Sequence, residues 1–425
     1  MSETHSSRFH GILTPLGNAD FRNLLISNTL WWQAMWMEMI VVGWLVLELT
    51  DSVWQVGLVG FFRSVPLLIT GFVAGPMADR FGRIRLILLS QSLSLIVIGV
   101  ITVLIWMDAI TYWHLVVGAA VFGTSWSFSW TARRALIPDL VGKNRIVDAM
   151  LLESFTQNIS RVAGPFASGT LIAVLGALGC YVALLIISIV SFLIMLLVHR
   201  PVHVPPIGKE TPWQLMTEGV RYVTKNQAIM GDLLITVAMN FLTFPFQTLL
   251  PVFARDILHE GPFELGLLGA CNGIGAFFGL LIVNKVRHNF SRGWIFAIGS
   301  ICQSVALLGF AIVSTFPLSY ALADSTVKLA FPLGLLTLVI AGLGQSAFGV
   351  MQSAIVLLAA RDDMRDRAMG TVVLAIGTGP FGRLQIGALA ESFGAPLALG
   401  LQTSVAIVAI IGVLIALPGF RARLK

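Results

Sequence analysis

The sequence predicts an all-α membrane protein with twelve transmembrane helices in two pseudo-symmetric six-helix bundles. Hydrophobic residues make up 56% of the 425 residues and the mean hydropathy is +0.87, more apolar surface than a soluble core could bury. The apolar residues form long stretches, and the two halves of the chain resemble each other. Since lipid offers no hydrogen-bond partners to the backbone, such stretches indicate helices rather than a barrel.

Twelve stretches have about the 20 apolar residues that a helix needs to cross roughly 30 Å of hydrocarbon. They span residues 24–47, 55–78, 86–106, 112–132, 149–175, 180–199, 229–253, 264–284, 294–314, 331–359, 370–391 and 397–418. Residues 1–22 are polar and lack the short apolar core of a cleavable signal. We therefore expect the first stretch to be an anchor.

The distribution of charge predicts the orientation of the chain. Most of the 27 Lys and Arg residues lie in the terminal tails and in the loops after stretches 2, 4, 6, 8 and 10. The opposite loops contain only Arg255 and Lys328. Because cytoplasmic loops are enriched in Lys and Arg, both termini are expected in the cytoplasm, with the protein in the cell inner membrane. These small clusters do not suggest nucleic-acid binding.

The chain is expected to divide into an N-terminal bundle, 1–199, a cytoplasmic linker, 200–228, and a C-terminal bundle, 229–425. In the linker, a capping-box pattern from Thr211 to Gln214 precedes apolar residues at helical spacing. This pattern predicts an amphipathic helix on the membrane surface.

A gapless shift of 209 residues aligns the two halves. It places "VGLVGFFRS", from Val56, on "LGLLGACNG", from Leu265, and Arg83 on Arg292. Parallel repeats of this kind are typical of transporters with a substrate site near the middle of the membrane. Chance similarity between apolar helices is the alternative interpretation.

The loop "GPMADRFGRIR" matches the pattern G-x-x-x-D-R-x-G-R through Gly75, Asp79, Arg80, Gly82 and Arg83. With this loop between stretches 2 and 3, the chain resembles the major facilitator superfamily. The stretches "TARRALIPDLV", "ISRVAGPFASG" and "IGALAESFGAP" look like the secretion-effector branch that includes the enterobactin exporter. The resemblance covers nearly the whole chain and implies the major facilitator fold and secondary transport.

The resemblance also implies a conformational latch at this loop. It places Asp79 near the cytoplasmic start of stretch 11, and Arg83 could hold Asp79 by a charge-assisted bond. We expect the latch to close the inner side. The corresponding loop of the second half, "KVRHNFSR", has His288 in place of the aspartate, so the latch is expected to be one-sided.

The segment "SRVAGPFASG" approximates the antiporter signature G-x-x-x-G-P-x-x-G-G of stretch 5. It retains Gly164, Pro165 and Gly169, whereas Ser160 and Ser168 replace glycines. Small residues let helices approach closely, so helix packing is as good an interpretation as a role in coupling.

Ionisable residues well inside the stretches are Glu38, Arg63, Arg161 and Arg383. Each is costly in lipid unless paired or hydrated, which makes each a candidate functional residue. Counting from the turn near Asp51 places Glu38 and Arg63 at similar depth, and we expect them to face each other. Glu38 is predicted to carry a proton, because its protonation would release Arg63. The alternative is a permanently ionised bridge that locks stretch 1 to stretch 2.

Three arginines against one acid favour an anionic substrate. Arg161 matches an arginine that is usual in the resembled family, where it could serve structure. Arg383 stands where relatives usually have a small residue. Its alternatives are a substrate contact, a pair with Glu391 or a bond to a carbonyl.

In the resembled fold, stretches 1, 4, 7 and 10 line the cavity. With Arg161 and Arg383, the expected substrate-binding residues are Trp31, Met35, Trp126, Trp130, Asn240, Gln247, Asn272, Gln345 and Gln352. Arg63 is assigned with Glu38 to proton coupling. Among these, Gln247 and Asn272 correspond to Glu38 and Arg63 under the 209-residue shift. Aromatic and amide side chains together suit a bulky amphipathic molecule, although core packing explains the Trp and Met residues equally well.

The sequence therefore predicts a proton-coupled exporter of an amphipathic, anionic small molecule such as a siderophore or drug, not an enzyme. No phosphate-binding G-x-x-x-x-G-K-[ST] pattern occurs, so we expect an ion gradient to drive transport. The expected partners are the substrate, a proton and membrane lipid, for a monomer without cofactor, metal or nucleic acid. The alternatives are a lysophospholipid flippase on the same fold and a non-transporting membrane sensor.

Overall fold

The computed structural model describes residues 13–142, 145–199, 218, 220–287, 289–316, 319–322, 325–361 and 364–421. The surroundings of Gly75, the side chain of Asp79 and the placement of His288 lie outside this described part, as does most of the predicted linker helix. Of that linker, residues 220–223 are helical and Val223 is buried.

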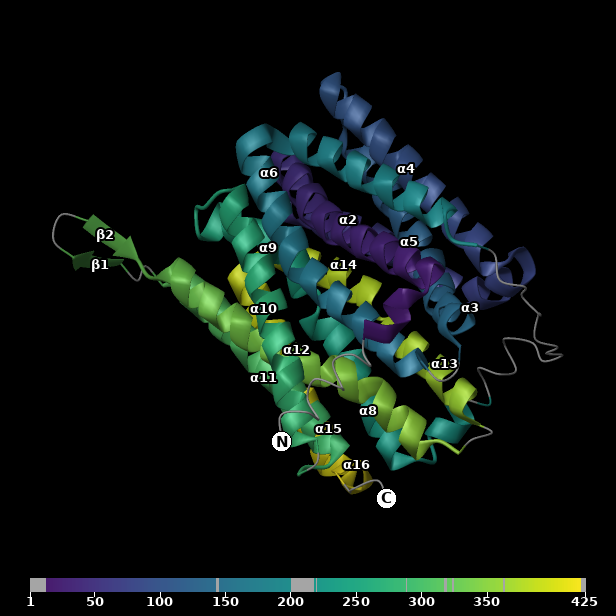
Figure 1. Ribbon diagram of the computed structural model, residues 1–425. Helices are drawn as coiled ribbons and strands as arrows, with labels where there is room; N and C mark the ends of the chain where they lie inside the picture. The colour runs from purple at the N-terminus through teal and green to yellow at the C-terminus, as the bar shows by residue number, and fades with distance from the viewer. Residues whose placement is uncertain are drawn as a thin grey trace, which may run out of the picture. The chain divides into compact units, whose positions relative to one another are not determined.

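The described chain is helical almost throughout (Figure 1). The N-terminal elements are η1 (Thr14–Gly17), α2 (Ala19–Thr50), α3 (Val53–Phe81), α4 (Arg83–Trp106), α5 (Tyr112–Val141) and α6 (Ile146–Leu196). The C-terminal helices are α8 (Gln227–Ala238), η3 (Met239–Thr243), α9 (Phe246–Val252), η4 (Phe253–Ile257), α10 (Pro262–Val286), α11 (Arg292–Thr315), α12 (Ala330–Ala359), α13 (Arg365–Ile376), α14 (Gly379–Phe393), α15 (Ala395–Ala416) and α16 (Pro418–Arg421).

The predicted fold class is confirmed, because all twelve apolar stretches coincide with helical segments. Within the described residues, nine helical segments are long and apolar enough to cross a membrane. The 51-residue α6 covers two of the predicted stretches. It bends at Gly176, whose φ of 71° lies in the left-handed region that glycine adopts without steric cost, and this bend separates the fifth and sixth spans.

The seventh predicted stretch is a broken helix. The π-helical turn η3 follows α8, and Phe244 N–H donates to the Met239 carbonyl five residues earlier, at 2.8 Å. Pro245 then precedes α9, and the second π-helical turn, η4, follows it. Because proline lacks an N–H group, it cannot continue the regular hydrogen-bond ladder, which explains the break.

One short loop differs from the all-helical expectation. Strands β1 (Ser319–Leu322) and β2 (Ser325–Lys328) form an antiparallel hairpin between α11 and α12. Tyr320 pairs with Val327 in its register. The hairpin projects from the ends of these helices (Figure 1).

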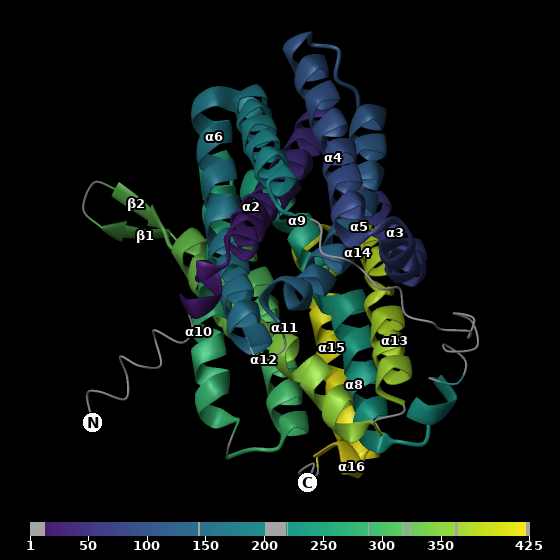
Figure 2. The same cartoon turned by 45° about the vertical axis from the view of Figure 1, so that its right-hand side comes forward.

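The chain folds as two compact units. The first comprises Met1–Leu45 and Phe62–Gly208, and the second comprises Val46–Phe61 and Lys209–Lys425. The tip of the α2–α3 hairpin, residues 46–61, therefore belongs to the C-terminal unit, although it lies within the predicted N-terminal bundle. In the C-terminal unit, α12 packs against both α10 and α11 (Figure 2).

Candidate functional site

Glu38 of α2 and Arg63 of α3 form an ion pair inside the N-terminal unit. Glu38 is only 3% exposed. Arg63 also donates from Nη2 to the Met35 carbonyl oxygen at 3.4 Å, and its guanidinium lies 5.2 Å from the centre of the Phe122 ring. The opposite charge and these contacts offset the cost of removing both groups from water. The structure thus brings the two residues together, while their part in proton coupling stays a prediction.

The corresponding residues of the second half do not form an equivalent pair. Gln247 lies on α9 and Asn272 lies on α10. Among the described residues, no hydrogen bond joins their side chains, and the buried Nδ2 of Asn272 has no partner. The internal repeat therefore preserves the helices here without preserving the side-chain contact.

The other two predicted arginines have no acidic partner among the described residues. The guanidinium of Arg161, on α6, lies 5.3 Å from the centre of the Trp36 ring. Arg383, on α14, passes close to α3, because a Cβ atom built on Gly60 would lie 3.2 Å from its Cδ. The proposed partner of Arg383, Glu391, instead binds the start of α3, as described below.

Two of the predicted amides meet at one threonine of α8. Asn240 donates from Nδ2 to the Thr236 carbonyl at 2.9 Å, and Gln352 of α12 donates from Nε2 to Thr236 Oγ1 at 3.0 Å. The buried Oε1 of Gln345 has no partner in the described part of the chain. Asn240 and Gln352 are therefore anchored side chains, whereas Gln345 keeps an unused acceptor.

The predicted aromatic residues form two contacts in the N-terminal unit. Trp126 and Trp130 stack on α5 with their ring centres 5.7 Å apart, and the Arg134 guanidinium lies 4.9 Å from the Trp130 ring. Trp31 meets Trp32 edge to face at 4.9 Å. Within the described residues, the buried indole N–H groups of Trp126 and Trp130 have no acceptor, so each retains a donor that a ligand could use.

A buried charge network that the sequence analysis missed lies near Trp31. Arg133 of α5 is 2% exposed and Glu153 of α6 is 6% exposed. Asn28 joins them, because its Oδ1 accepts from Arg133 and its Nδ2 donates to Glu153 at 2.6 Å. Glu153 also accepts from Trp32 Nε1 at 3.3 Å. The amide thus satisfies a buried anion and a buried cation at once.

Serine hydroxyls complete the network on the side of Arg133. Its Nε donates to Ser129 Oγ at 3.0 Å, and its Nη1 lies 3.4 Å from Ser27 Oγ. The guanidinium also lies 5.1 Å from the centre of the Trp31 ring. The network therefore contacts the Trp31–Trp32 pair at both rings, through Arg133 at Trp31 and through Glu153 at Trp32.

The antiporter-like segment packs α6 against α2. The two serines that replace signature glycines each donate to a carbonyl of α2, Ser160 to Thr29 at 3.2 Å and Ser168 to Met37 at 3.0 Å. Gly164 and Pro165 are buried between these serines, and Gly169 follows them on the same helix. The two serines that depart from the signature therefore form hydrogen bonds between α6 and α2.

The loop between α3 and α4 contains an ion pair that the sequence analysis did not anticipate. Arg83 pairs with Asp139 of α5 and donates to the Ala135 carbonyl at 2.5 Å. Gly82 has a φ of 85° at the start of α4, and the Arg80 guanidinium lies 5.8 Å from the Phe81 ring centre. The contact of Arg83 with Asp79 stays a prediction, because the Asp79 side chain is outside the described part.

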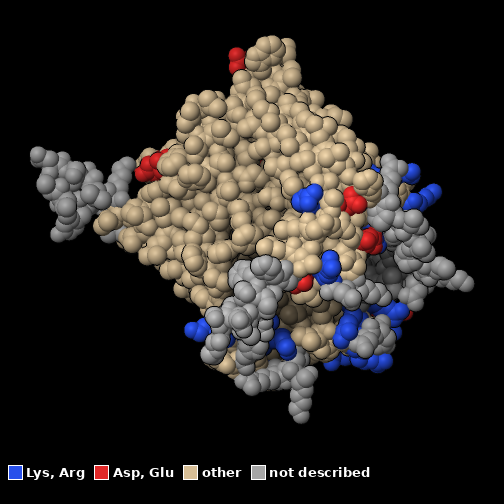
Figure 3. All heavy atoms as spheres, viewed as in Figure 1, with Lys and Arg blue, Asp and Glu red and all other residues tan. Residues whose placement is uncertain are grey.

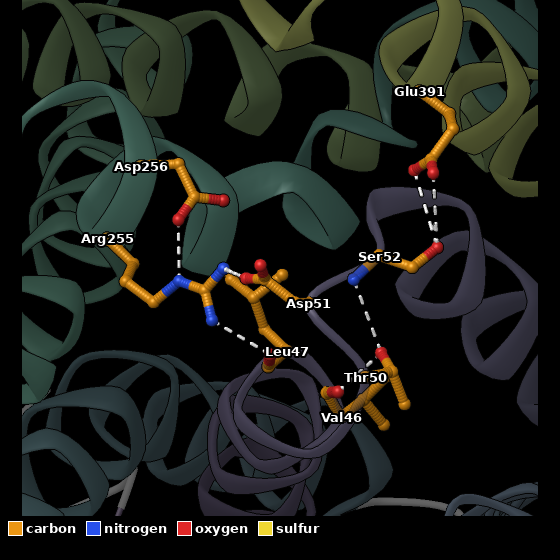
Figure 4. Close-up of polar contacts among 8 residues, drawn as sticks. All are labelled: Val46, Leu47, Thr50, Asp51, Ser52, Arg255, Asp256 and Glu391. Atoms are coloured by element: carbon orange, nitrogen blue, oxygen red, sulfur yellow. Dashed lines mark hydrogen bonds and ion pairs between the residues drawn. The ribbon is translucent and has the colours of Figure 1, made fainter.

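At the tip of the α2–α3 hairpin, Arg255 binds three groups (Figure 4). It pairs with Asp51 and with Asp256, and its Nη1 donates to the Leu47 carbonyl at 2.8 Å. Asp51 itself has a φ of 50°, which aspartate tolerates better than most residues. Arg255 thus holds the end of α2 and the turn after it against η4.

Glu391 of α14 binds the start of α3 in the same unit (Figure 4). Its Oε2 accepts from the Trp54 backbone N–H at 2.9 Å, and Ser52 Oγ lies 3.4 Å from both carboxylate oxygens. One turn later the two backbones touch, since a Cβ atom on Gly57 would lie 2.8 Å from the Gly387 Cα. We call the contacts of Arg255 and Glu391 the hairpin clasp.

Long apolar helices with a buried ion pair inside one unit fit the class of membrane transporters with the major facilitator fold. The pattern of the transmembrane secretion effector family matches residues 10–424, and the chain belongs to this family. The resemblance inferred from the sequence is therefore confirmed, and the chain is an export transporter on this fold.

Three relatives illustrate the family. The staphyloferrin A transporter of Staphylococcus aureus is 26% identical over 286 residues, which cover 67% of this chain and 71% of that protein. The multidrug efflux pump Tap of Mycobacterium tuberculosis is 24% identical over 383 residues, or 84% of each chain. The enterobactin exporter EntS of Salmonella choleraesuis is 25% identical over 268 residues, which cover 62% of this chain and 63% of that protein.

Solved structures share the fold at low identity. The nucleoside transporter NupG has a TM-score of 0.73 at 11% identity and covers 95% of this chain and 100% of its own. A bacterial homologue of the lysosomal transporter Spinster has a TM-score of 0.66 at 14% identity and covers 94% of this chain and 95% of its own. At these identities the likeness concerns the fold alone.

Proposed function

We propose that this protein is a proton-coupled exporter of amphipathic small molecules with an anionic group, of the siderophore or drug class. The observation that carries the proposal is the buried ion pair between Glu38 and Arg63, since an intramembrane carboxylate is the kind of group that carries protons in transporters. The names of the relatives, which include siderophore transporters and a multidrug pump, support the substrate class.

The coupling step follows from the charges of the pair. A proton that reaches Glu38 from the outer side neutralises the carboxylate and ends its attraction to Arg63. The contact between α2 and α3 then weakens, and the carrier changes the side to which its site opens. Loss of the proton to the inner side restores the pair and completes the cycle.

The test is substrate movement in proteoliposomes with an imposed pH gradient. The probes are catecholate and carboxylate siderophores and amphipathic dyes, and the variant is Glu38→Gln, which keeps the shape and removes the charge. We expect pH-driven movement to be lost while exchange without a gradient remains. Full pH-driven activity of this variant would exclude Glu38 from coupling, and uptake of labelled lysophospholipid without a gradient would favour a lipid flippase instead.

We also propose that the protein is a monomer of the cell inner membrane with both termini in the cytoplasm, as the distribution of Lys and Arg favours. The loop from Gly75 to Arg83 then lies on the cytoplasmic side and acts as a latch that closes it. Asp79→Asn should bias the carrier toward the inward-open state. Inner-side thiol labelling checks this, and unchanged labelling would exclude the latch.

A further inference from the structure

An apolar groove of about 350 Å³ lies on the C-terminal unit between α10, α11 and α12. These helices lie side by side in Figures 1 and 2. The groove is apolar along its length and includes Val286, Phe290, Ile298, Cys302, Leu343 and Ala347. Its volume falls in the range of small-molecule sites. It therefore offers room for a flexible hydrocarbon chain.

The groove exists because glycines let these helices cross closely. A Cβ atom on Gly299 of α11 would lie 3.0 Å from the Gly344 carbonyl of α12, so the two backbones are nearly in contact. Around this crossing the larger side chains point outward, and Phe290 is 57% exposed and Ile298 is 54% exposed. In a membrane-spanning unit such an exposed apolar surface faces lipid, not water.

One end of the groove carries unpaired positive charge. Lys285, Arg287 and Arg292 lie at the turn from α10 to α11, next to the groove residues Val286 and Phe290. None of the three forms an ion pair within the described residues, and the sequence from 284 to 292 contains no acid. In Figure 3, Lys and Arg gather along the lower edge of the face, where Figure 1 shows α8, α15 and α16 of this unit.

We propose that the groove binds an acyl chain of an anionic phospholipid whose phosphate is held by Lys285, Arg287 and Arg292. An apolar channel ends here at three cations that form no ion pair within the described residues. This arrangement matches a molecule with a hydrocarbon tail and a negative head, whereas a zwitterionic lipid lacks the net charge. Basic clusters beside membrane helices attract anionic headgroups in this way. On the proposed orientation, the lipid belongs to the inner leaflet. The site is separate from the ion pair of the N-terminal unit.

The test compares phosphatidylglycerol with phosphatidylcholine by native mass spectrometry of the full-length protein. Wild type should retain phosphatidylglycerol at least about tenfold more tightly than phosphatidylcholine. The triple variant Lys285→Gln, Arg287→Gln, Arg292→Gln should lose this preference. Cys302→Phe fills the groove but keeps all three charges, and it should weaken both lipids. Because the three charged residues are at a surface turn, the triple variant tests the site without disturbing the core.

The matched control is Arg221→Gln, Lys225→Gln, which removes two basic charges from the same unit away from the groove. It should keep the preference for phosphatidylglycerol. An equal loss in the control would mean that general surface charge attracts the lipid, which would overturn the proposal. Equal affinity of wild type for the two lipids would overturn it as well. So would glycerol phosphate binding as tightly as the lipid, because the chain would then contribute nothing.

Discussion

Asn28 joins a buried carboxylate to a buried guanidinium through one hydrogen bond to each. We therefore expect it to contribute more to the stability of the N-terminal unit than a side chain with a single local hydrogen bond. Asn28→Ala removes the donor to Glu153 and the acceptor of Arg133 together. A hydrogen bond to a charged group contributes about 1.5 to 3 kcal/mol, and this variant loses two of them. We expect it to lower the free energy of unfolding in detergent by about 3 kcal/mol, measured by titration with sodium dodecyl sulfate.

Asn158→Ala is the matched control for this prediction. Asn158 lies on α6, and within the described residues its side chain donates only to the Ser154 carbonyl of its own helix, at 2.8 Å. Asn158→Ala should therefore lower the free energy of unfolding by much less than Asn28→Ala does. If the two variants were equally stable, the network through Asn28 would contribute no more than a local hydrogen bond.

The residues of the candidate site differ in how far the sequence revealed them. Glu38 and Arg63 could be matched by counting from one turn, because both lie deep in regular helices. Arg133 could not be predicted in this way, because the apolar stretch ends at residue 132 and the sequence pattern places the arginine in the following loop. The structure extends α5 to Val141 and buries Arg133. A charged residue just beyond an apolar stretch can still face the interior when its partners, here Asn28 and Glu153, are on other helices.

At the scale of elements, the hydrogen bonds from α6 to α2 explain why serines replace the signature glycines. A side-chain hydrogen bond between membrane helices contributes about 0.6 kcal/mol on average. The double variant Ser160→Ala, Ser168→Ala should therefore lower the free energy of unfolding by about 1 kcal/mol, because both donors to α2 are lost. The matched control, Ser90→Ala, removes a buried hydroxyl whose hydrogen bond in the described part of the chain stays within α4. A loss no greater than that of the control would contradict the interhelical role.

The hairpin clasp makes a second prediction about elements. Glu391 accepts from the Trp54 N–H at the first turn of α3, as a capping group would. Removing a helix cap costs about 1 kcal/mol, so Glu391→Ala should speed amide hydrogen exchange at Trp54 about fivefold. Asp108→Ala, at the turn between α4 and α5, is the control and should leave Trp54 unchanged. Unaltered exchange in Glu391→Ala would show that the clasp does not hold the hairpin.

The helices were predictable from apolar length, but their interruptions were not. The π-helical turns near Pro245 and Pro251 do not lower the hydropathy of the seventh stretch enough to divide it. Hydropathy alone therefore predicts one continuous helix for this stretch. The β1–β2 hairpin lies in a short loop of mixed polar and apolar residues, and its strands of four residues are too short for a long alternating pattern. The clasp depends on residues about 200 and 340 positions apart in the chain, Arg255 with Asp51 and Glu391 with Ser52, and no local pattern records such pairings.

At the scale of the whole molecule, each compact unit holds a candidate-site arginine that lies in a membrane helix without an acidic partner among the described residues. Arg161 is in the N-terminal unit and Arg383 is in the C-terminal unit. The 209-residue repeat does not relate them, since Arg161 corresponds to Gly370. The two halves therefore share a fold but place their positive charges independently. Two guanidinium groups without acidic partners among the described residues suit the anionic substrate that we propose.

Neutralising either arginine should accordingly weaken binding of anionic amphipaths and spare neutral ones. For Arg161→Gln and for Arg383→Gln we expect the Kd of an aromatic carboxylate amphipath to rise about tenfold, equivalent to about 1.4 kcal/mol. The Kd of its neutral amide should change by no more than about twofold, since the amide has no charge to lose. Quenching of tryptophan fluorescence measures both. Arg145→Gln, which removes an exposed arginine at the N-cap of α6, is the control. Equal losses for the carboxylate and the amide would show that these arginines support the helices and do not select the charge of the cargo.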